Sequence, residues 1–195
     1  LLEKKNPGKI IGSVGNLSAT GNSLGFIALG KEILPALENK ISKRNFKIHI
    51  FGKGKFKPSI IPYIQNDNII TRGFVENLNE EIISASVFLI SNNRYNFKVG
   101  HTRFLHAWSL GACVVAYKSC CEAMPEIQHD YNALLGSSSE EIAELVSKAL
   151  RDIKLRRRIG IGGFETLKKK FSPRSVTKEL INFVNLEQNK KDNQW

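Results

Sequence analysis

Short apolar runs alternate along the chain with longer stretches that carry apolar residues at helical spacing. Six runs have the composition or the alternation expected of strands: residues 9–15, 46–52, 68–75, 87–91, 112–117 and 131–136. The run at 87–91 is wholly apolar, which is typical of a strand buried on both faces of a parallel sheet. The pattern therefore predicts an α/β protein.

The stretches between these runs have helical spacing and, in several cases, recognisable ends. Asn79 is the expected N-cap of one helix, Gly111 is the expected stop of another, and Ser137 to Ser139 followed by two glutamates predicts a third start. Helices are expected over residues 24–41, 58–64, 80–85, 102–110, 142–151, 155–170 and 173–186. Alternating strands and helices predict a doubly wound parallel sheet with helices on both faces.

The predicted organisation is one α/β domain over residues 1–186, followed by a polar tail at 187–195. The helix at 173–186 comes after a complete α/β pattern and carries its own apolar residues, so we expect it to leave this core as a crossover helix. The chain begins without Met and with no long apolar stretch, so we expect a fragment that starts at a domain boundary and has no signal peptide. No run approaches the roughly 20 apolar residues of a membrane-spanning helix.

The balance of charges favours anionic partners. Twenty-nine Lys and Arg against 18 Asp and Glu give a net charge of +11, much of it in the C-terminal third. Phosphates, nucleic acid and anionic lipid surfaces all fit such a charge, and a solvated helix face is the simplest explanation of the C-terminal cluster. Peripheral attachment to the inner face of a membrane through this basic surface is therefore an open expectation.

Cysteines and histidines indicate no metal site and no disulfide framework. The three cysteines are clustered without CxxC spacing, and the four histidines have no zinc-finger pairing with them. A reducing, cytoplasmic compartment and a protein without metal or cofactor are the resulting expectations.

Ligands of doubly wound sheets bind beyond the carboxyl ends of the strands, so the loops there hold the candidate residues. Gly15 follows the first strand, but its neighbours form neither GxGxxG nor a P-loop, which disfavours a nicotinamide dinucleotide. Gly52 and Lys53 follow the second strand, and Phe74 and Val75 follow the third.

The loop after the fourth strand carries the strongest concentration of candidates. It delivers Lys98, Gly100, His101, Thr102 and Arg103 to the start of a helix, where backbone N–H groups and the helix dipole favour an anion. His106 follows Arg103 by three residues on the same helix face, and packing and ligand binding are about equally expected for it.

The order of these motifs resembles the carboxyl-terminal domain of GT-B-fold glycosyltransferases of family 4, the glycosyl transferases group 1 family. The likeness covers about residues 9–185, and its longest motif is Arg103 to Ala116, which is similar to the family's lys-x-leu-glu-ala … gly-x-pro-val-val-ala. Further similar segments are Ile11 to Leu17, Ile50 to Gly54, Asn68 to Val75, Leu78 to Ile90 and Leu155 to Phe171.

The resemblance implies a domain that binds a nucleotide-diphosphate sugar, with a separate amino-terminal domain for the acceptor and sugar transfer with retention of configuration. By position, Gly15 and Asn16 would approach the diphosphate. The set Gly52, Lys53, Phe74 and Val75 would flank the base, and Gly100 to Arg103 would meet phosphates and sugar. His106 would face the ribose.

Four positions depart from the family pattern. Lys98 and His106 stand where the family usually has two glutamates, and Asn16 and Thr20 stand where it often has Arg and Lys. The catalytic residues are therefore not assigned. Two other classes stay open: a non-catalytic binding domain of the same fold, which the lost glutamates favour, and a nucleic-acid-binding module, which net charge alone favours. The latter lacks aromatic residues interleaved with Lys and Arg on a strand, so no specific nucleic acid is expected.

Overall fold

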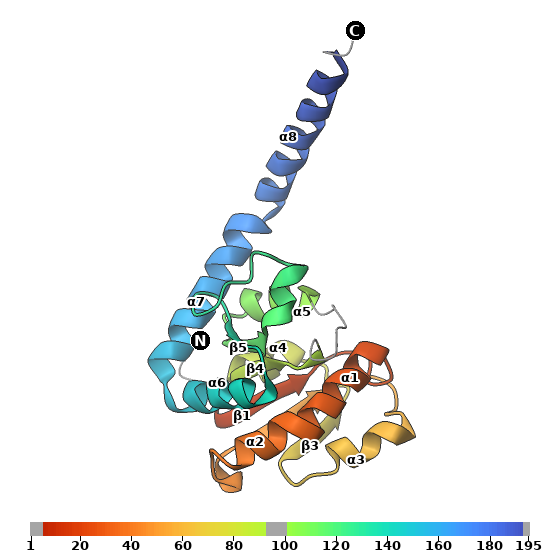
Figure 1. Cartoon of the computed structure of the whole chain (residues 1–195), viewed down its shortest axis with the longest axis vertical. Coiled ribbons are helices and arrows are strands. Elements are labelled where there is room, and N and C mark those ends of the chain that lie inside the picture. Colours follow the sequence, from red (N-terminus) through yellow and green to blue (C-terminus); the bar gives the residue numbers. More distant parts are fainter. Residues whose placement is uncertain (1–5, 93–100, 193–195) are drawn as a thin grey trace.

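A computed structural model describes residues 6–92 and 101–192 and has a parallel six-stranded sheet within them (Figure 1). The strands are β1 (Asn6–Ser13), β2 (Lys47–Phe51), β3 (Ile69–Gly73), β4 (Ala85–Ile90), β5 (Val114–Tyr117) and β6 (Leu134–Gly136). Their spatial order is β3-β2-β1-β4-β5-β6, so the direction of winding reverses between β1 and β4. This order confirms the doubly wound sheet that the sequence predicts.

Helices fill the connections between strands, close to the predicted positions. They are α1 (Thr20–Ala28), α2 (Leu34–Glu38), α3 (Ile61–Ile64), α4 (Leu78–Ser84), α5 (His101–Ser109), α6 (Ser139–Arg151), α7 (Ile153–Lys170) and α8 (Pro173–Asp192). A five-residue π-helical segment (Leu29–Ile33) joins α1 to α2, and 3-10 turns occupy Lys43–Asn45, Pro58–Ile60 and Lys118–Glu122.

Two predicted helix boundaries were wrong. The N-cap of α4 is Asn77 rather than Asn79, because the Asn77 side chain accepts the backbone N–H of Glu80. The helix at the C-terminus does not end at residue 186 but continues to Asp192, so most of the expected polar tail is helical. Other ends agree: Ser138 caps α6, and Gly111 follows α5 with a φ of 63°.

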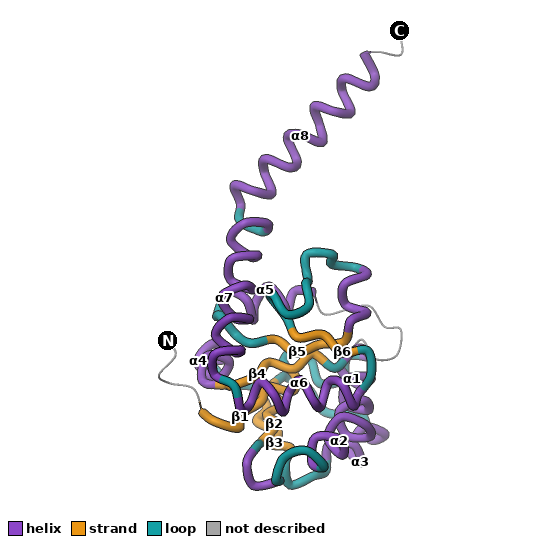
Figure 2. Tube along the Cα trace, turned by 60° about the vertical axis from the view of Figure 1, so that its left-hand side comes forward, coloured by secondary structure: helices purple, strands orange, loops and turns teal. Residues whose placement is uncertain are grey.

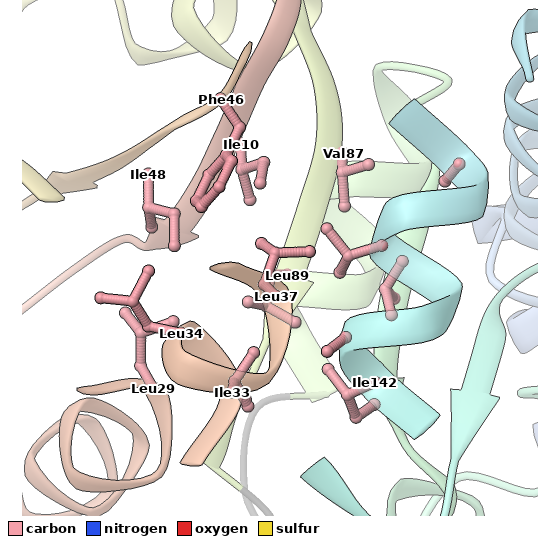
Figure 3. Packing of buried hydrophobic residues seen from close by; sticks show 14 of the residues in the cluster. Ile10, Leu29, Ile33, Leu34, Leu37, Phe46, Ile48, Val87, Leu89 and Ile142 are labelled. Atoms are coloured by element: carbon pink, nitrogen blue, oxygen red, sulfur yellow. The ribbon is translucent and has the colours of Figure 1, made fainter. Parts of the chain in front are cut away.

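The sheet is covered by helices on both faces. One core cluster packs residues of α1, α2 and α6 against Ile10, Ile48, Val87 and Leu89 of the central strands (Figure 3). The other cluster packs α4 and α5 against the opposite face, with Phe104 and Trp108 among its fully buried side chains. Burial of these two faces stabilises the position of the strands. Because the strands are parallel, their carboxyl ends all lie on the same side of the sheet.

Helix α7 packs closely on α5 because it has glycine at the contact. A Cβ on Gly163 would stand 2.2 Å from Cδ1 of Trp108, so no larger residue fits without movement. The Trp108 indole N–H donates to the carbonyl of Asn132 at 2.9 Å, and the Asn132 amide donates to the hydroxyl of Thr166 at 2.9 Å. These bonds tie α7 to α5 and to the segment before β6.

Beyond Phe171 the last helix leaves the body of the domain. Figure 2 shows α8 projecting away from the sheet and its covering helices. Its role as a crossover helix stays a prediction. Five of its apolar side chains are exposed: Val176, Leu180, Ile181, Phe183 and Val184. Among the described residues, no helix is long and apolar enough to cross a membrane.

The β2 residue His49 gives the fold a pH dependence. Burial lowers its pKa, the positive charges of Lys9 and Arg72 lower it further, and Glu81 opposes them. The folded ring therefore resists a proton that the unfolded ring accepts near pH 6.5, so this contribution to stability is present above about pH 6.5 and is lost as the pH falls.

We expect His49→Gln to flatten the fall in the free energy of unfolding between neutral and mildly acidic pH, measured by urea titration. An unchanged slope in this variant contradicts the assignment.

Candidate functional site

A pocket of about 780 Å³ lies at the carboxyl ends of β1, β2 and β3. Its size is that of a typical small-ligand site, and its position is the one where doubly wound sheets bind ligands. Six predicted site residues line it: Gly15, Asn16, Gly52, Lys53, Phe74 and Val75. Five further lining residues were not predicted individually: Ser18, Phe51, Gly54, Glu76 and Leu78. Ser18, Gly54 and Glu76 lie in the three loops that follow β1, β2 and β3, so position after a strand is the signal that finds them. Phe51 ends β2, and Leu78 begins α4.

The floor of the pocket forms where the loops after β1 and β2 meet. The backbone N–H of Lys53 donates to the carbonyl of Gly15 at 3.2 Å, and the N–H of Leu17 donates to the carbonyl of Lys53 at 2.9 Å. A Cβ on Gly52 would stand 1.8 Å from the Gly15 carbonyl oxygen. Glycine at position 52 is therefore required for the two loops to join.

Asn16 shapes the first loop through its own side chain. Its Oδ1 accepts the backbone N–H of Ser18 at 3.0 Å and the Ser18 hydroxyl at 2.9 Å. Its carbonyl accepts the amide N–H of Asn22, on the first turn of α1, at 2.6 Å. The loop from β1 to α1 is thus held from both ends, and Asn16 occupies the pocket side of it.

The opposite wall carries an exposed aromatic ring with a cation above it. Phe74 is 62% exposed, which is unusual for phenylalanine, and the Lys53 ammonium lies 4.4 Å from its ring centroid. Cation–π attraction accounts for this pair. The pair places one flat apolar surface and one positive charge at the mouth of the same pocket.

Arg103, on the first turns of α5, does not line this pocket but is connected to it. Its guanidinium donates to Oδ1 of Asn22, and Asn22 in turn donates to the Asn16 carbonyl. Burial lowers the pKa of Arg103. In the part of the chain that the structure describes, this desolvated cation is bonded to a neutral amide rather than to a carboxylate, which leaves its charge available to an anion.

His106 faces α4 instead of the pocket interior. Its Nε2 lies 2.8 Å from Oδ1 of Asn79, next in sequence to the lining residue Leu78. Because that oxygen is an acceptor, Nε2 carries the proton in this arrangement. The ring of His106 is half-buried, and it reaches the pocket wall only through Asn79, the residue after Leu78.

The remaining predicted residues are placed less fully. Thr102 is exposed on α5, and His101 begins that helix. Lys98 and Gly100 lie outside the described residues, so the structure does not place them. Asn22 was not predicted individually, because its role depends on a contact between residues 81 positions apart.

The cysteines have the environment of packing residues. Burial raises the pKa of Cys120 to about 12, so its thiol is not a nucleophile at neutral pH. The thiol of Cys121 donates to the carbonyl of Ile127 at 3.2 Å. Within residues 6–92 and 101–192, no group of three or more His, Cys, Asp or Glu side chains is placed to hold a metal ion.

Fold and pocket together define a doubly wound α/β domain with a ligand-sized pocket at the carboxyl ends of its strands, and sequence comparison shows the family. The model of the family "Glycosyl transferases group 1" matches residues 8–152, which is most of the chain. This protein therefore belongs to the glycosyl transferases group 1 family. No curated protein matches the sequence as a relative.

Solved structures with the same fold share little sequence identity with this chain. TarM of S. aureus, solved with UDP among its ligands, has a TM-score of 0.68 and 17% identity, over 88% of this chain and 35% of that one. HepE of Anabaena, solved with UDP and glucose, has a TM-score of 0.66 and 16% identity, over 90% of this chain and 48% of that one. The chain thus spans between a third and a half of these two proteins.

A third similar structure is itself a single domain. The C-terminal domain of the group 1 glycosyltransferase LpcC from Francisella tularensis has a TM-score of 0.59 and 20% identity, with 88% of this chain and 90% of that one covered. This match in length agrees with the resemblance to a carboxyl-terminal GT-B domain, and it confirms the predicted fold.

The contact between Gly52 and Gly15 can be tested by stability. We expect Gly52→Ala to lower the free energy of unfolding by about 1–3 kcal/mol, because the added methyl group must displace backbone rather than a flexible side chain. Gly73→Ala is the matched control. Gly73 has a φ of 67° but nothing within 4 Å of a Cβ, so it bears backbone strain of about 1 kcal/mol without a clash. Equal urea midpoints for the two variants would contradict this prediction, because the clash at position 52 would then cost no more stability than backbone strain alone.

Proposed function

We propose that this chain is the donor-binding domain of a retaining glycosyltransferase and that its pocket takes a nucleotide-diphosphate sugar. The observation that supports this most strongly is the pocket at the carboxyl ends of β1 to β3, lined by six residues predicted for that ligand, in a member of the group 1 family. UDP is the nucleotide to test first, because TarM and HepE were solved with it.

The pocket offers different chemistry to the two parts of such a ligand. Phe74 and Val75 present apolar surface on which a base could lie, and Lys53 brings a positive charge beside the ring. Gly15 and Asn16 present backbone without bulk, which allows a phosphate to approach closely. In this proposal the base lies toward β3 and the diphosphate lies toward the start of α1.

Departure of the diphosphate requires stabilisation of negative charge, and protein cations would supply it. Arg103 is the best placed described candidate, since it lies beside the β1–α1 loop and is bonded to a neutral amide. By sequence position, Lys98 and the N-terminus of α5 at His101 are the further proposed members of this anion site. No catalytic residue is assigned.

A second candidate is a binding domain of this family that has lost catalysis. It is favoured by Lys98 and His106, which stand at the family's glutamate positions, and by the bond that directs the His106 Nε2–H to Asn79. Both candidates share nucleotide binding. A donor hydrolysis or transfer assay on the whole protein separates them, because a degenerate domain binds the donor without turnover.

We further propose that the acceptor binds to an amino-terminal domain of the same polypeptide and that α8 packs partly against it. The exposed apolar side chains of α8 support this, since a helix with such a face is normally covered. The working compartment in this proposal is the cytoplasm, where nucleotide sugars would be the donors, and the pathway is cell-envelope polysaccharide synthesis. The isolated domain should bind the donor but not transfer sugar.

Arg103 tests the anion site. We expect Arg103→Ala to weaken UDP binding by about 1–3 kcal/mol, the range for loss of a charge-assisted hydrogen bond, as measured by titration calorimetry. Asn22→Ala is the control, because it breaks the bond to the loop but keeps the cation. A smaller loss in Asn22→Ala supports direct contact with the diphosphate. Equal losses mean that Arg103 acts by positioning the loop, and unchanged binding in Arg103→Ala rules out both.

His106 tests the ribose contact. A neutral imidazole can accept a hydroxyl hydrogen bond at one nitrogen while it donates from the other. We expect His106→Ala to weaken binding of UDP while binding of inorganic pyrophosphate, which has no ribose, changes little. Equal weakening for the two ligands, or no weakening, contradicts this role. A lower melting temperature with both affinities intact would identify His106 as a packing residue.

A further inference from the structure

The exposed side of α7 combines apolar and cationic side chains in a way that the donor pocket does not use. Ile153, Ile161 and Phe164 are 44%, 58% and 49% exposed. Arg157 and Lys168 are exposed on the same helix. Spacings of four, four, three and four residues put these five side chains on one face, hereafter the α7 face.

A groove runs beside this face. It has a volume of about 480 Å³, and α4, the turn after α5 and α7 all contribute to its lining. Ile83, Leu110, Ile161 and Phe164 supply its apolar surface, and Arg157 and Lys168 stand on its rim. It forms because α7 approaches the α5 turn through glycine: a Cβ on Gly160 would stand 2.3 Å from the Gly111 carbonyl oxygen.

The charges around the groove have one predominant sign. Arg157 and Lys168 are eleven residues apart, about 16 Å along the helix, with the apolar pair between them. Lys154, Lys169 and Lys170 are also exposed on α7. Glu165 is the carboxylate of the groove lining, and it accepts a hydrogen bond from the Tyr131 hydroxyl at 3.2 Å. Arg158 is excluded from this count because it pairs with Asp130.

We propose that the α7 face docks on an anionic lipid membrane, with Ile161 and Phe164 inserted below the phosphate level and Arg157 and Lys168 on lipid phosphates. The bilayer interface takes both kinds of group together: apolar side chains enter the acyl boundary while flanking cations meet anionic headgroups. A nucleic acid would match the cations but would leave the two exposed apolar residues unused, so it is the weaker match.

The position of the α7 face leaves the donor pocket open during docking. Ile83 and Gly111 lie just before β4 and β5, at the amino ends of these strands. The donor pocket lies at the carboxyl ends of β1, β2 and β3. The two surfaces have no lining residue in common, so docking and nucleotide binding can be tested separately.

The test is co-sedimentation of the 195-residue chain with vesicles of phosphatidylcholine, with and without phosphatidylglycerol. We expect binding to the anionic vesicles that weakens with added salt. The double variant Ile161→Ser with Phe164→Ser should lower the partition coefficient at least about tenfold. Arg157→Gln and Lys168→Gln should each lower it about fivefold, the factor that corresponds to about 1 kcal/mol per cation.

Matched controls come from other parts of the chain. Ile61 on α3 is 47% exposed, and Lys31 is an exposed cation between α1 and α2, so Ile61→Ser and Lys31→Gln should leave the partition unchanged. Leu180→Ser with Phe183→Ser tests whether the exposed apolar side of α8 binds the vesicles instead. Phe164→Trp should give a blue-shifted emission increment on anionic vesicles, which reports insertion directly.

The proposal is overturned if the chain does not sediment with anionic vesicles, if the α8 pair abolishes binding while the α7 pair does not, or if the controls lose as much as the α7 variants. Binding to a polynucleotide that persists in the Ile161 and Phe164 double variant, together with no vesicle binding, assigns the cations to nucleic acid and also overturns it. UDP affinity should be the same in all these variants. Failure of UDP binding in the unmodified chain would overturn the proposed function without affecting this result.

Discussion

The carbonyl oxygen of Gly15 occupies the space that any side chain at position 52 would need, and the candidate site depends on that contact. It lets the loops after β1 and β2 pair through their backbones, with Lys53 bonded to Gly15 and Leu17 to Lys53. Lys53 is thereby held where its ammonium can reach the ring of Phe74 on the neighbouring loop. A close backbone approach, rather than a particular side chain, thus brings three strand ends together into one pocket.

Among the described residues, Arg103 is linked to the first loop of the pocket through amides. Arg103 is desolvated and bonded to Asn22, which is itself bonded to the Asn16 carbonyl, so a chain of neutral groups links a cation on α5 to the first glycine loop. Burial of a cation without a carboxylate is unfavourable unless an anion completes the site. Within the described residues this arrangement favours a ligand that brings negative charge, and under the proposed function the diphosphate of the donor would supply it.

Different surfaces lie at the two ends of the parallel strands. The carboxyl edge of β1 to β3 holds the pocket, whereas the amino ends of β4 and β5 adjoin the α7 face with its mixed cations and apolar side chains. A glycine allows a close backbone contact at each end. Gly52 lets the loops after β1 and β2 join, and Gly160 lets α7 approach the turn after α5. Helix α8 then carries further apolar surface away from the domain (Figure 1).

Local pattern determined the elements of this protein: apolar runs set the strands, helical spacing set the helices, and the position of a loop after a strand located most of the pocket lining. Tertiary structure decided what those residues contact. Arg103 meets Asn22, and His106 meets Asn79, through side chains 81 and 27 positions apart. Choice between neighbouring caps such as Asn77 and Asn79 likewise depended on the final backbone. Periodicity indicates which face of a helix or strand is buried. Which side chains bond between two elements depends on the position of each element to within about an ångström, and the packing of the whole core sets that position.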